Sequence, residues 1–210
     1  MIKFTNATIY RNSDANEILV TDGVIQQIGK GLPAATEEID LKGRLVVPPY
    51  VDSHLHLDYV YTGGGDEAKN ASGTLFEGIA RWHDVKKTQS FEDAKARMLR
   101  GIQEEVSKGV QYIRTHIDVC DPDLTGLKAM LELREELKDN VTIQSVAFPQ
   151  EGMYAYKGAV ELMEEALKMG ADCVGGIPHF EWAYAFGQDS LRKTVEIALK
   201  YDTLTNVNGE

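Results

Sequence analysis

The stretch Val46–Asp58, with the sequence VVPPYVDSHLHLD, decides how the rest of the chain is interpreted. Its apolar run ends in two histidines, His54 and His56, separated by one residue. Because successive side chains of a strand point to opposite faces, both histidines should project to the same side, with Cβ atoms about 7 Å apart. Two imidazoles at that spacing can bind one metal ion, and a structural pair without a metal is the alternative. We favour the metal site, because packing alone does not easily satisfy two neighbouring imidazoles at a strand end.

The composition is typical of an acidic, soluble α/β protein. A chain of 210 residues, 43% of them hydrophobic, can form one large domain or one domain and a smaller one. A net charge of −11 argues against a nucleic-acid partner, and no apolar run is long enough for a signal peptide or a membrane span. Two cysteines, Cys120 and Cys173, are too few for a disulfide framework, so we expect a reducing compartment, the cytoplasm.

Two domains are expected, with their boundary at Pro48-Pro49. Residues 1–49 show short alternating segments and no helical period, which predicts a small β-sandwich-like module. Residues 50–210 alternate strand-like and helix-like segments. The elements expected in the first domain are an opening hairpin over residues 2–9, a hairpin that turns at Asp22-Gly23, and a strand over residues 39–47 that is broken by Gly43.

The second domain is predicted to be part of a (β/α) barrel. After the histidine strand, the expected strands are 110–118, 141–148, 173–177 and 204–208, and the expected helices are 74–87, 91–108, 124–138, 159–169 and 190–200. Apolar strands joined by helices indicate a parallel sheet, and Gly63-Gly64-Gly65 lacks the spacing of a nucleotide-binding loop. A full barrel takes about 250 residues. We therefore expect an incomplete (β/α)8 TIM-type barrel of about four βα units, the N-terminal half of a larger protein.

Polar side chains follow the predicted strands at their C-terminal ends, where barrels place their active sites. Those outside the first strand are His116, Asp118, Gln150, His179 and Glu181. We expect His116 to be a hydrogen-bonded neighbour of a metal-binding histidine rather than a ligand, and Asp118 and His179 to be candidates for the same role. His179 could equally pack at the barrel mouth. The amide of Gln150 suits an uncharged, planar ligand, with capping of a backbone group as the alternative. The absence of lysine from residues 171–181 favours a single metal ion.

Longer strings of residues resemble known enzymes. Residues 22–29 and 47–56, which include DGVI and VDSHLH, resemble the start of the amidohydrolase superfamily. Four further strings are similar to bacterial-type cytosine deaminases, and the similarity extends over essentially all 210 residues. They are SGTLFEGI at 72–79, RTHIDV at 114–119, VAFPQEG at 146–152 and IPHFE at 177–181.

The resemblance implies a metal-dependent hydrolase that converts cytosine and water to uracil and ammonia. It implies that His54 and His56 bind one divalent ion, Fe²⁺ or Zn²⁺, which activates the attacking water. It also implies that Gln150 and Leu75 contact the pyrimidine ring, the small-molecule partner. One position departs from the pattern, because Asn208 stands where the family has a histidine ligand on its fifth strand. The proton-shuttling residues of the family lie beyond Glu210, so the catalytic residues stay unknown.

There are two alternative hypotheses to deamination of cytosine. The chain could be a catalytically inactive remnant, or a related aminohydrolase acting on an amino-triazine or a modified cytosine. Since half a barrel would leave open edges at its first and fourth strands, we expect the chain alone to be inactive and to self-associate or to need a missing C-terminal half.

Overall fold

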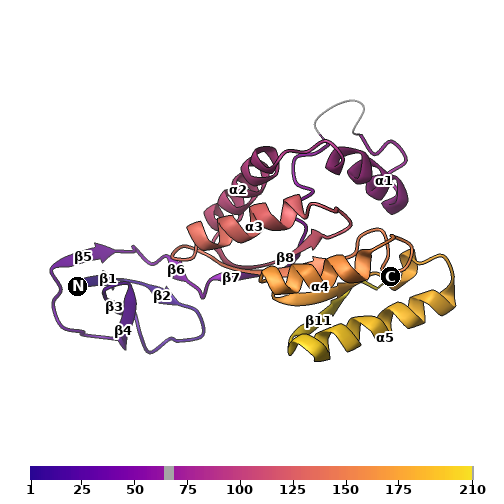
Figure 1. Cartoon of the computed structure of the whole chain (residues 1–210). Helices are drawn as coiled ribbons and strands as arrows, with labels where there is room; N and C mark the ends of the chain where they lie inside the picture. Colours follow the sequence, from indigo (N-terminus) through magenta and orange to yellow (C-terminus); the bar gives the residue numbers. More distant parts are fainter. Residues whose placement is uncertain (64–68, 210) are drawn as a thin grey trace. The chain divides into compact units, whose positions relative to one another are not determined.

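The structure, a computed structural model, describes residues 1–63 and 69–209. The chain divides into two compact units, Met1–Pro49 and Tyr50–Glu210 (Figure 1). Two residues of the glycine run considered above, Gly64 and Gly65, lie outside the described residues.

The first unit contains a four-stranded sheet in the order β4-β3-β1-β5. Its strands are β1 (Ile2–Thr5), β3 (Glu17–Thr21), β4 (Val24–Gly29) and β5 (Glu37–Asp40). The β3–β4 hairpin turns at Asp22 and Gly23, whose φ angles of 51° and 75° suit this residue pair. The hairpin expected at this turn is therefore confirmed.

The opening hairpin predicted for residues 2–9 is wrong. β1 pairs antiparallel with β3 and parallel with β5, whereas β2 (Thr8–Ile9) pairs parallel with β6 (Leu45–Val46) in a separate sheet. Asn6 turns the chain between β1 and β2 with a φ of 51°, and its side chain donates to Asp40 Oδ1 at 2.9 Å. The strand expected over residues 39–47 was predicted to be broken at Gly43, and the structure divides it there, because Lys42 and Gly43 adopt positive φ angles of 54° and 77°.

The second unit is a parallel five-stranded sheet in the order β11-β10-β9-β8-β7. Its strands are β7 (Tyr50–Leu55), β8 (Val110–Asp118), β9 (Thr142–Phe148), β10 (Cys173–Gly176) and β11 (Leu204–Val207). Each strand lies beside its neighbour in sequence, as in a barrel. The partial TIM barrel predicted from the sequence is confirmed. β10 lies between β9 and β11, so the second open edge belongs to β11 and not to the fourth strand.

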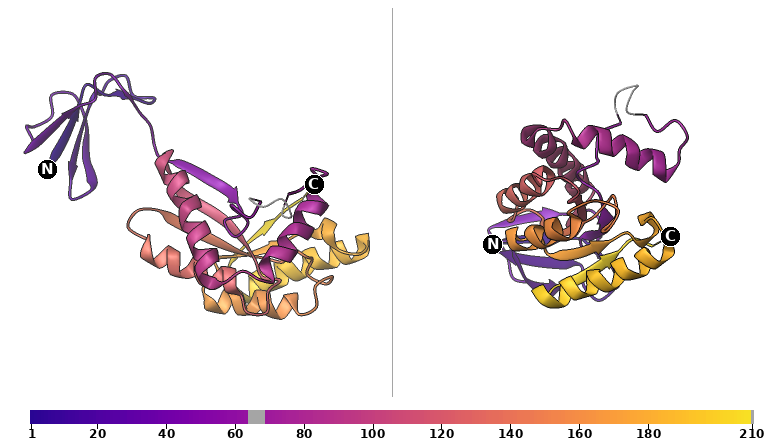
Figure 2. Two further views of the ribbon diagram at one scale, coloured as in Figure 1. Left: turned by 90° about the horizontal axis from the view of Figure 1, so that it is seen from above. Right: turned by 45° about the vertical axis from the view of Figure 1, so that its right-hand side comes forward.

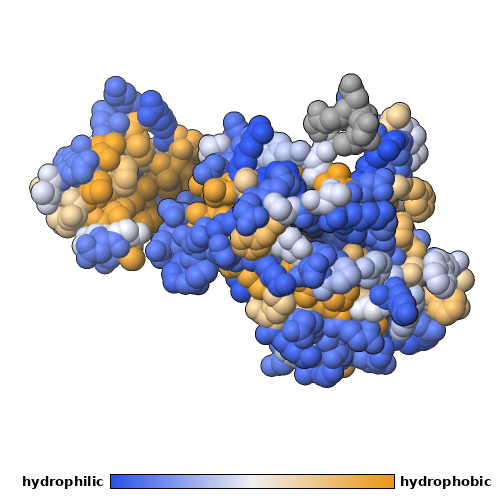
Figure 3. All heavy atoms as spheres, turned by 45° about the horizontal axis from the view of Figure 1, so that its top comes forward, coloured by the Kyte–Doolittle hydropathy of each residue, from blue (hydrophilic) through white to orange (hydrophobic). Residues whose placement is uncertain are grey.

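Helices follow the strands along the chain and lie beside the sheet (Figures 1 and 2). They are α1 (Leu75–Lys86), α2 (Phe91–Ser107), α3 (Thr125–Glu136), α4 (Ala159–Met169) and α5 (Tyr184–Tyr201), with a 3₁₀ turn at Pro178–Phe180. In the view of Figure 3 the outward surface of these helices is mainly hydrophilic. No described helix combines the length and the apolar character needed to cross a membrane.

The helix ends carry local signals in the sequence. Ser90 Oγ accepts from Asp93 N at 3.1 Å and begins α2, and Gly109, with a φ of 92°, follows its end. α5 begins at Tyr184, earlier than the predicted start at Ser190, and Ser190 lies inside the helix, where its hydroxyl donates to Gly187 O at 2.8 Å. The core between helices and sheet is built from buried side chains that include Met98, Ile117, Leu127, Met130, Leu133 and Met163.

Candidate metal and ring-binding site

Three histidines meet at the C-terminal ends of β7 and β8. His54 is the penultimate residue of β7, His56 follows its last residue, and His116 lies two residues before the end of β8. One nitrogen from each ring lies within 4.8 Å of the others. The ring centroids are 5.5 Å apart for His54 and His56, 4.3 Å for His54 and His116, and 5.0 Å for His56 and His116. These three residues could hold a metal ion.

The protonation states of His56 and His116 are compatible with binding a metal ion. Burial, with repulsion from His116 and His54, lowers the pKa of His56 to about 3. Burial also lowers the pKa of His116. Both rings are therefore neutral near pH 7, and imidazole lone pairs are ligands that zinc and iron accept. Among the described residues, the buried Nδ1 atoms of His56 and His116 have no hydrogen-bond partner.

Asn206, on β11, orients His116. His116 Nε2 lies 3.0 Å from Asn206 Oδ1, and because a carboxamide oxygen only accepts, the tautomer that satisfies this contact carries its proton on Nε2. The lone pair of His116 is then at Nδ1, the atom without a partner. The structure therefore places His116 among possible ligand atoms, although the sequence favoured a role as their neighbour. Asn206 was not identified from the sequence, because a strand asparagine 90 residues away gives no local signal.

A cavity of about 640 Å³ opens beside the histidines. The start of α1 and the residues at and just after the end of β11, which are far apart in sequence, both border it. None of the described lining residues is an aspartate, glutamate, lysine or arginine. The lining comprises His54, His56, Tyr59, Asn70, Gly73, Thr74, Leu75, Gly78, Ile79, Gln150, Ile177, His179, Val207, Asn208 and Gly209.

Neutral polar side chains in this cavity retain unused hydrogen-bonding capacity. Gln150 lines the cavity and is 3% exposed. Both ring nitrogens of His179, and Oδ1 of Asn208, are buried without a partner among the described residues. Leu75, the first residue of α1, adds an apolar surface that is 44% exposed. The structure thus brings Gln150, Leu75 and His179 into the cavity with His54 and His56.

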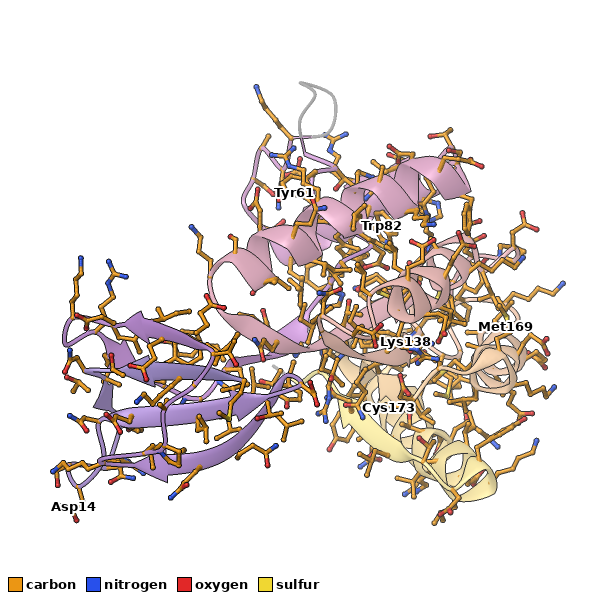
Figure 4. The ribbon with its side chains drawn as sticks, turned by 90° about the vertical axis from the view of Figure 1, so that its left-hand side faces the viewer. Asp14, Tyr61, Trp82, Lys138, Met169 and Cys173 are labelled. Carbon is orange, nitrogen blue, oxygen red and sulfur yellow. The ribbon has the colours of Figure 1, made fainter. Side chains whose placement is uncertain are left out.

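Asp118 does not line this cavity. Its Oδ2 accepts from Trp82 Nε1 (Trp82 is labelled in Figure 4) and from Lys86 Nζ, both at 2.8 Å, and its Oδ1 accepts from Cys120 N at 2.8 Å. Its backbone N donates to Asp58 Oδ2 at 2.7 Å. Burial raises the pKa of Asp58 to about 8, so this carboxyl group holds a proton at neutral pH. These contacts fasten α1 to the strand ends.

Glu181 also turns away from the histidines. Its carboxylate accepts from the backbone N–H groups of Met153 (2.6 Å), Tyr154 (3.2 Å) and Ala155 (3.0 Å), and it does not line the cavity. It therefore anchors the loop after β9. His83, in the last turn of α1, places Nδ1 2.8 Å from Glu151 Oε1.

Comparison with known proteins identifies the family to which the chain belongs. Residues 37–205 match the amidohydrolase family. The chain belongs to the amidohydrolase family. This amidohydrolase superposes on 5-methylcytosine deaminase from Klebsiella pneumoniae, liganded with 5-fluorocytosine, with a TM-score of 0.91 and 42% identity. The match covers 98% of this chain and 50% of that one.

Two further similar proteins are named for activity on another ring compound, N-isopropylammelide. N-isopropylammelide isopropylaminohydrolase from Burkholderia multivorans has a TM-score of 0.79 and 29% identity, covering 100% of this amidohydrolase and 53% of that chain. N-isopropylammelide isopropyl amidohydrolase from Pseudomonas sp. (strain ADP) is 34% identical over 163 residues, which are 76% of this chain and 40% of that protein. The chain thus spans about half or less of the length of these relatives. The resemblance to amidohydrolases of the cytosine deaminase type is confirmed.

Proposed function

We propose that this amidohydrolase supplies the metal-binding and ring-binding part of a hydrolytic deaminase that acts on cytosine or a close relative such as 5-methylcytosine. One observation carries the proposal: a single cavity is lined by His54 and His56, two members of the three-histidine cluster, and by Gln150, which is 3% exposed. The 42% identity to a 5-methylcytosine deaminase supports the choice of ring.

His54, His56 and His116 would hold one divalent ion, Fe²⁺ or Zn²⁺. When bound, such an ion lowers the pKa of water toward neutrality and supplies a nucleophile. The neutral state of His56 and His116 and the free Nδ1 atoms leave lone pairs available for it. Asn206, whose Oδ1 lies 3.0 Å from His116 Nε2, would hold the His116 ring in the tautomer that leaves Nδ1 free for the ion.

Gln150 would recognise the amide-like edge of the ring, since a carboxamide both donates and accepts. Leu75 would lie against the ring. Because the described lining has no fixed charge, a carboxylate or phosphate on the substrate would lose its hydration without gaining a cationic partner. An uncharged heterocycle is therefore the expected substrate class.

A related aminohydrolase of amino-triazines is the second candidate, favoured by the 34% identity to the Pseudomonas enzyme. Such rings are also uncharged and planar, so the cavity lining accepts both classes. The third possibility is an inactive protein, since Asn208 in the cavity takes the position at which the resemblance implies a histidine. Amide oxygen is a weaker ligand than imidazole for zinc or ferrous iron.

The test uses the 210-residue chain stripped of metal and titrated with Zn²⁺, or with Fe²⁺ under anaerobic conditions. We expect one equivalent to bind, and His54→Ala or His56→Ala to abolish binding. His83→Ala is the matched control, because this histidine lies outside the cluster and should leave metal binding intact. Full metal content in both cluster variants would refute the assigned ligands.

Cytosine, 5-methylcytosine and N-isopropylammelide are then offered to the metal-loaded chain. Tighter binding of the pyrimidines than of the triazine supports the first candidate, and the reverse order supports the second. Ammonia release from a bound pyrimidine would exclude the inactive alternative. A chain that binds none of the three rings would refute the proposed function.

A further inference from the structure

A cluster of titratable side chains, consisting of Lys86, His83, Asp118 and Glu151, joins α1 to the end of β8 and the loop after β9; Lys86 and Asp118 are buried, whereas the His83 side chain is 39% exposed. The Lys86 side chain is 5% exposed, and its Nζ lies 2.8 Å from Asp118 Oδ2. The same ammonium group forms an ion pair with Glu151 Oε1, the oxygen that His83 Nδ1 approaches at 2.8 Å. We refer to these four residues as the Lys86 cluster.

Each segment that meets in the Lys86 cluster also contributes to the proposed site. Gln150 directly precedes Glu151, and His116 lies two residues before Asp118. α1 ends at Lys86, while its first turn presents Leu75 to the cavity. The cluster therefore connects the element that carries the ring-facing leucine to the loop that carries the ring-facing amide.

Packing alone does not explain a lysine at this position. Taking an ammonium and carboxylates out of water costs solvation free energy, and apolar residues of similar volume often stabilise a core as well or better. Burial pulls the pKa of Lys86 down, but Asp118 and Glu151 outweigh it and raise the pKa above its usual value. The group thus stays charged. A charged hydrogen-bonded pair fixes a direction and a separation that apolar contact leaves adjustable.

We propose that Lys86 and Glu151 are positioning residues: their ion pair sets the separation between Gln150 and Leu75 at which both contact one ring. Lys86 and Glu151 themselves lie outside the lining of the 640 Å³ cavity. Their effect on the ring therefore passes through Gln150 and α1. The inference rests on the proposed ring-binding function.

The main variant is Glu151→Gln. Glutamine keeps the shape of the side chain and a hydrogen-bond acceptor for Lys86, but it removes the ion pair between Lys86 and residue 151. The probe is cytosine, titrated into the Zn²⁺-loaded chain by calorimetry. We expect binding weaker by about fivefold to twentyfold, the size of an interaction between residues in contact, with Zn²⁺ stoichiometry unchanged. Lys87→Met is the matched control. Lys87 lies next to Lys86, but its side chain is 57% exposed and, among the described residues, forms an ion pair only with Asp84, at 3.4 Å, so cytosine affinity should change less than about twofold.

A double-mutant cycle separates positioning from general loosening of the fold. If Glu151 acts through Gln150, then Glu151→Gln should change cytosine affinity by less than about twofold when Gln150→Ala is already present. A merely structural residue would instead multiply the two losses. Multiplying losses, or unchanged affinity in Glu151→Gln alone, would overturn the inference.

Hydrogen exchange provides a readout that needs no ring. Loss of the ion pair should accelerate amide exchange of residues 150–153 and of α1 together, while exchange in α4 stays unchanged. Lys86→Met, which leaves two carboxylates without their cation, should give the same pattern with a larger amplitude. If wild-type chain bound no pyrimidine, the proposed function would fail, and this exchange pattern would still decide the coupling. Unaltered exchange in both segments would refute it.

Discussion

Replacing Glu181 by glutamine should destabilise the second unit more than its small change in shape suggests. The two carboxylate oxygens accept from three backbone N–H groups, those of Met153, Tyr154 and Ala155, at 2.6 to 3.2 Å. A glutamine offers one oxygen and one NH₂ group. At least one backbone N–H would therefore face another donor in a region where Glu181 is 9% exposed.

The cost follows from these contacts. Loss of one hydrogen bond to a charged acceptor costs about 1.5–3 kcal/mol, and a buried N–H left unsatisfied costs about 1–3 kcal/mol. Because the two contributions overlap, we expect Glu181→Gln to lower the free energy of unfolding by about 3 kcal/mol.

Urea unfolding followed by tryptophan fluorescence measures this loss. The two tryptophans, Trp82 and Trp182, both lie in the second unit, so the signal reports on that unit. Glu165→Gln is the control, because the Glu165 side chain is 55% exposed and, within the part of the chain that the structure describes, forms an ion pair only with Lys168, at 3.4 Å. A loss in Glu181→Gln no larger than that of the control would refute the anchoring role.

Three further outcomes are expected. Gly175→Ala should lower stability by about 1–3 kcal/mol in the same urea assay, since its Cβ would lie 2.7 Å from a backbone carbonyl oxygen of β9; wild-type stability would contradict this. Asn206→Ala should weaken Zn²⁺ binding by about tenfold to a hundredfold by freeing the His116 tautomer, and unchanged affinity would count against that role. Hydrogen bonds from Ser72 and its neighbour hold the pKa of Glu77 at about 2, below its usual 4.5, so its stabilising effect is present above pH 4.5 and is lost as pH falls toward 2. The difference in thermal midpoint between wild type and Glu77→Gln should disappear over that range, and a constant difference would argue otherwise.

The second unit was predicted accurately because its signals are local. Parallel strands that are buried on both faces appear as continuous apolar runs, and caps such as Ser90 mark where helices begin. The spacing of His54 and His56 likewise placed both rings on one side of the chain. Alternation of strand side chains is a property of the backbone, so it needs no knowledge of tertiary contacts.

The failures share a non-local origin. Parallel pairing of β1 with β5, across more than thirty residues, leaves no trace in either strand, so a hairpin looked equally suitable. The role of Glu181 depends on backbone N–H groups 26 to 28 residues earlier in the chain. The burial of Lys86 depends on two carboxylates from other strand ends. Neither partner set could be inferred from charge or spacing.

The Lys86 cluster also has a consequence for the order of folding. The contacts that fasten α1 span 32 residues to Asp118 and 68 residues from His83 to Glu151. Closing such long loops costs chain entropy before any contact is gained, whereas α2, β8 and α3 are neighbours in sequence. We therefore expect α1 to dock after β8 and β9 have paired, with φ-values near zero for substitutions in α1 when refolding is followed by fluorescence. Cytosine binding would then be acquired only in the last phase of folding, after most of the sheet has formed.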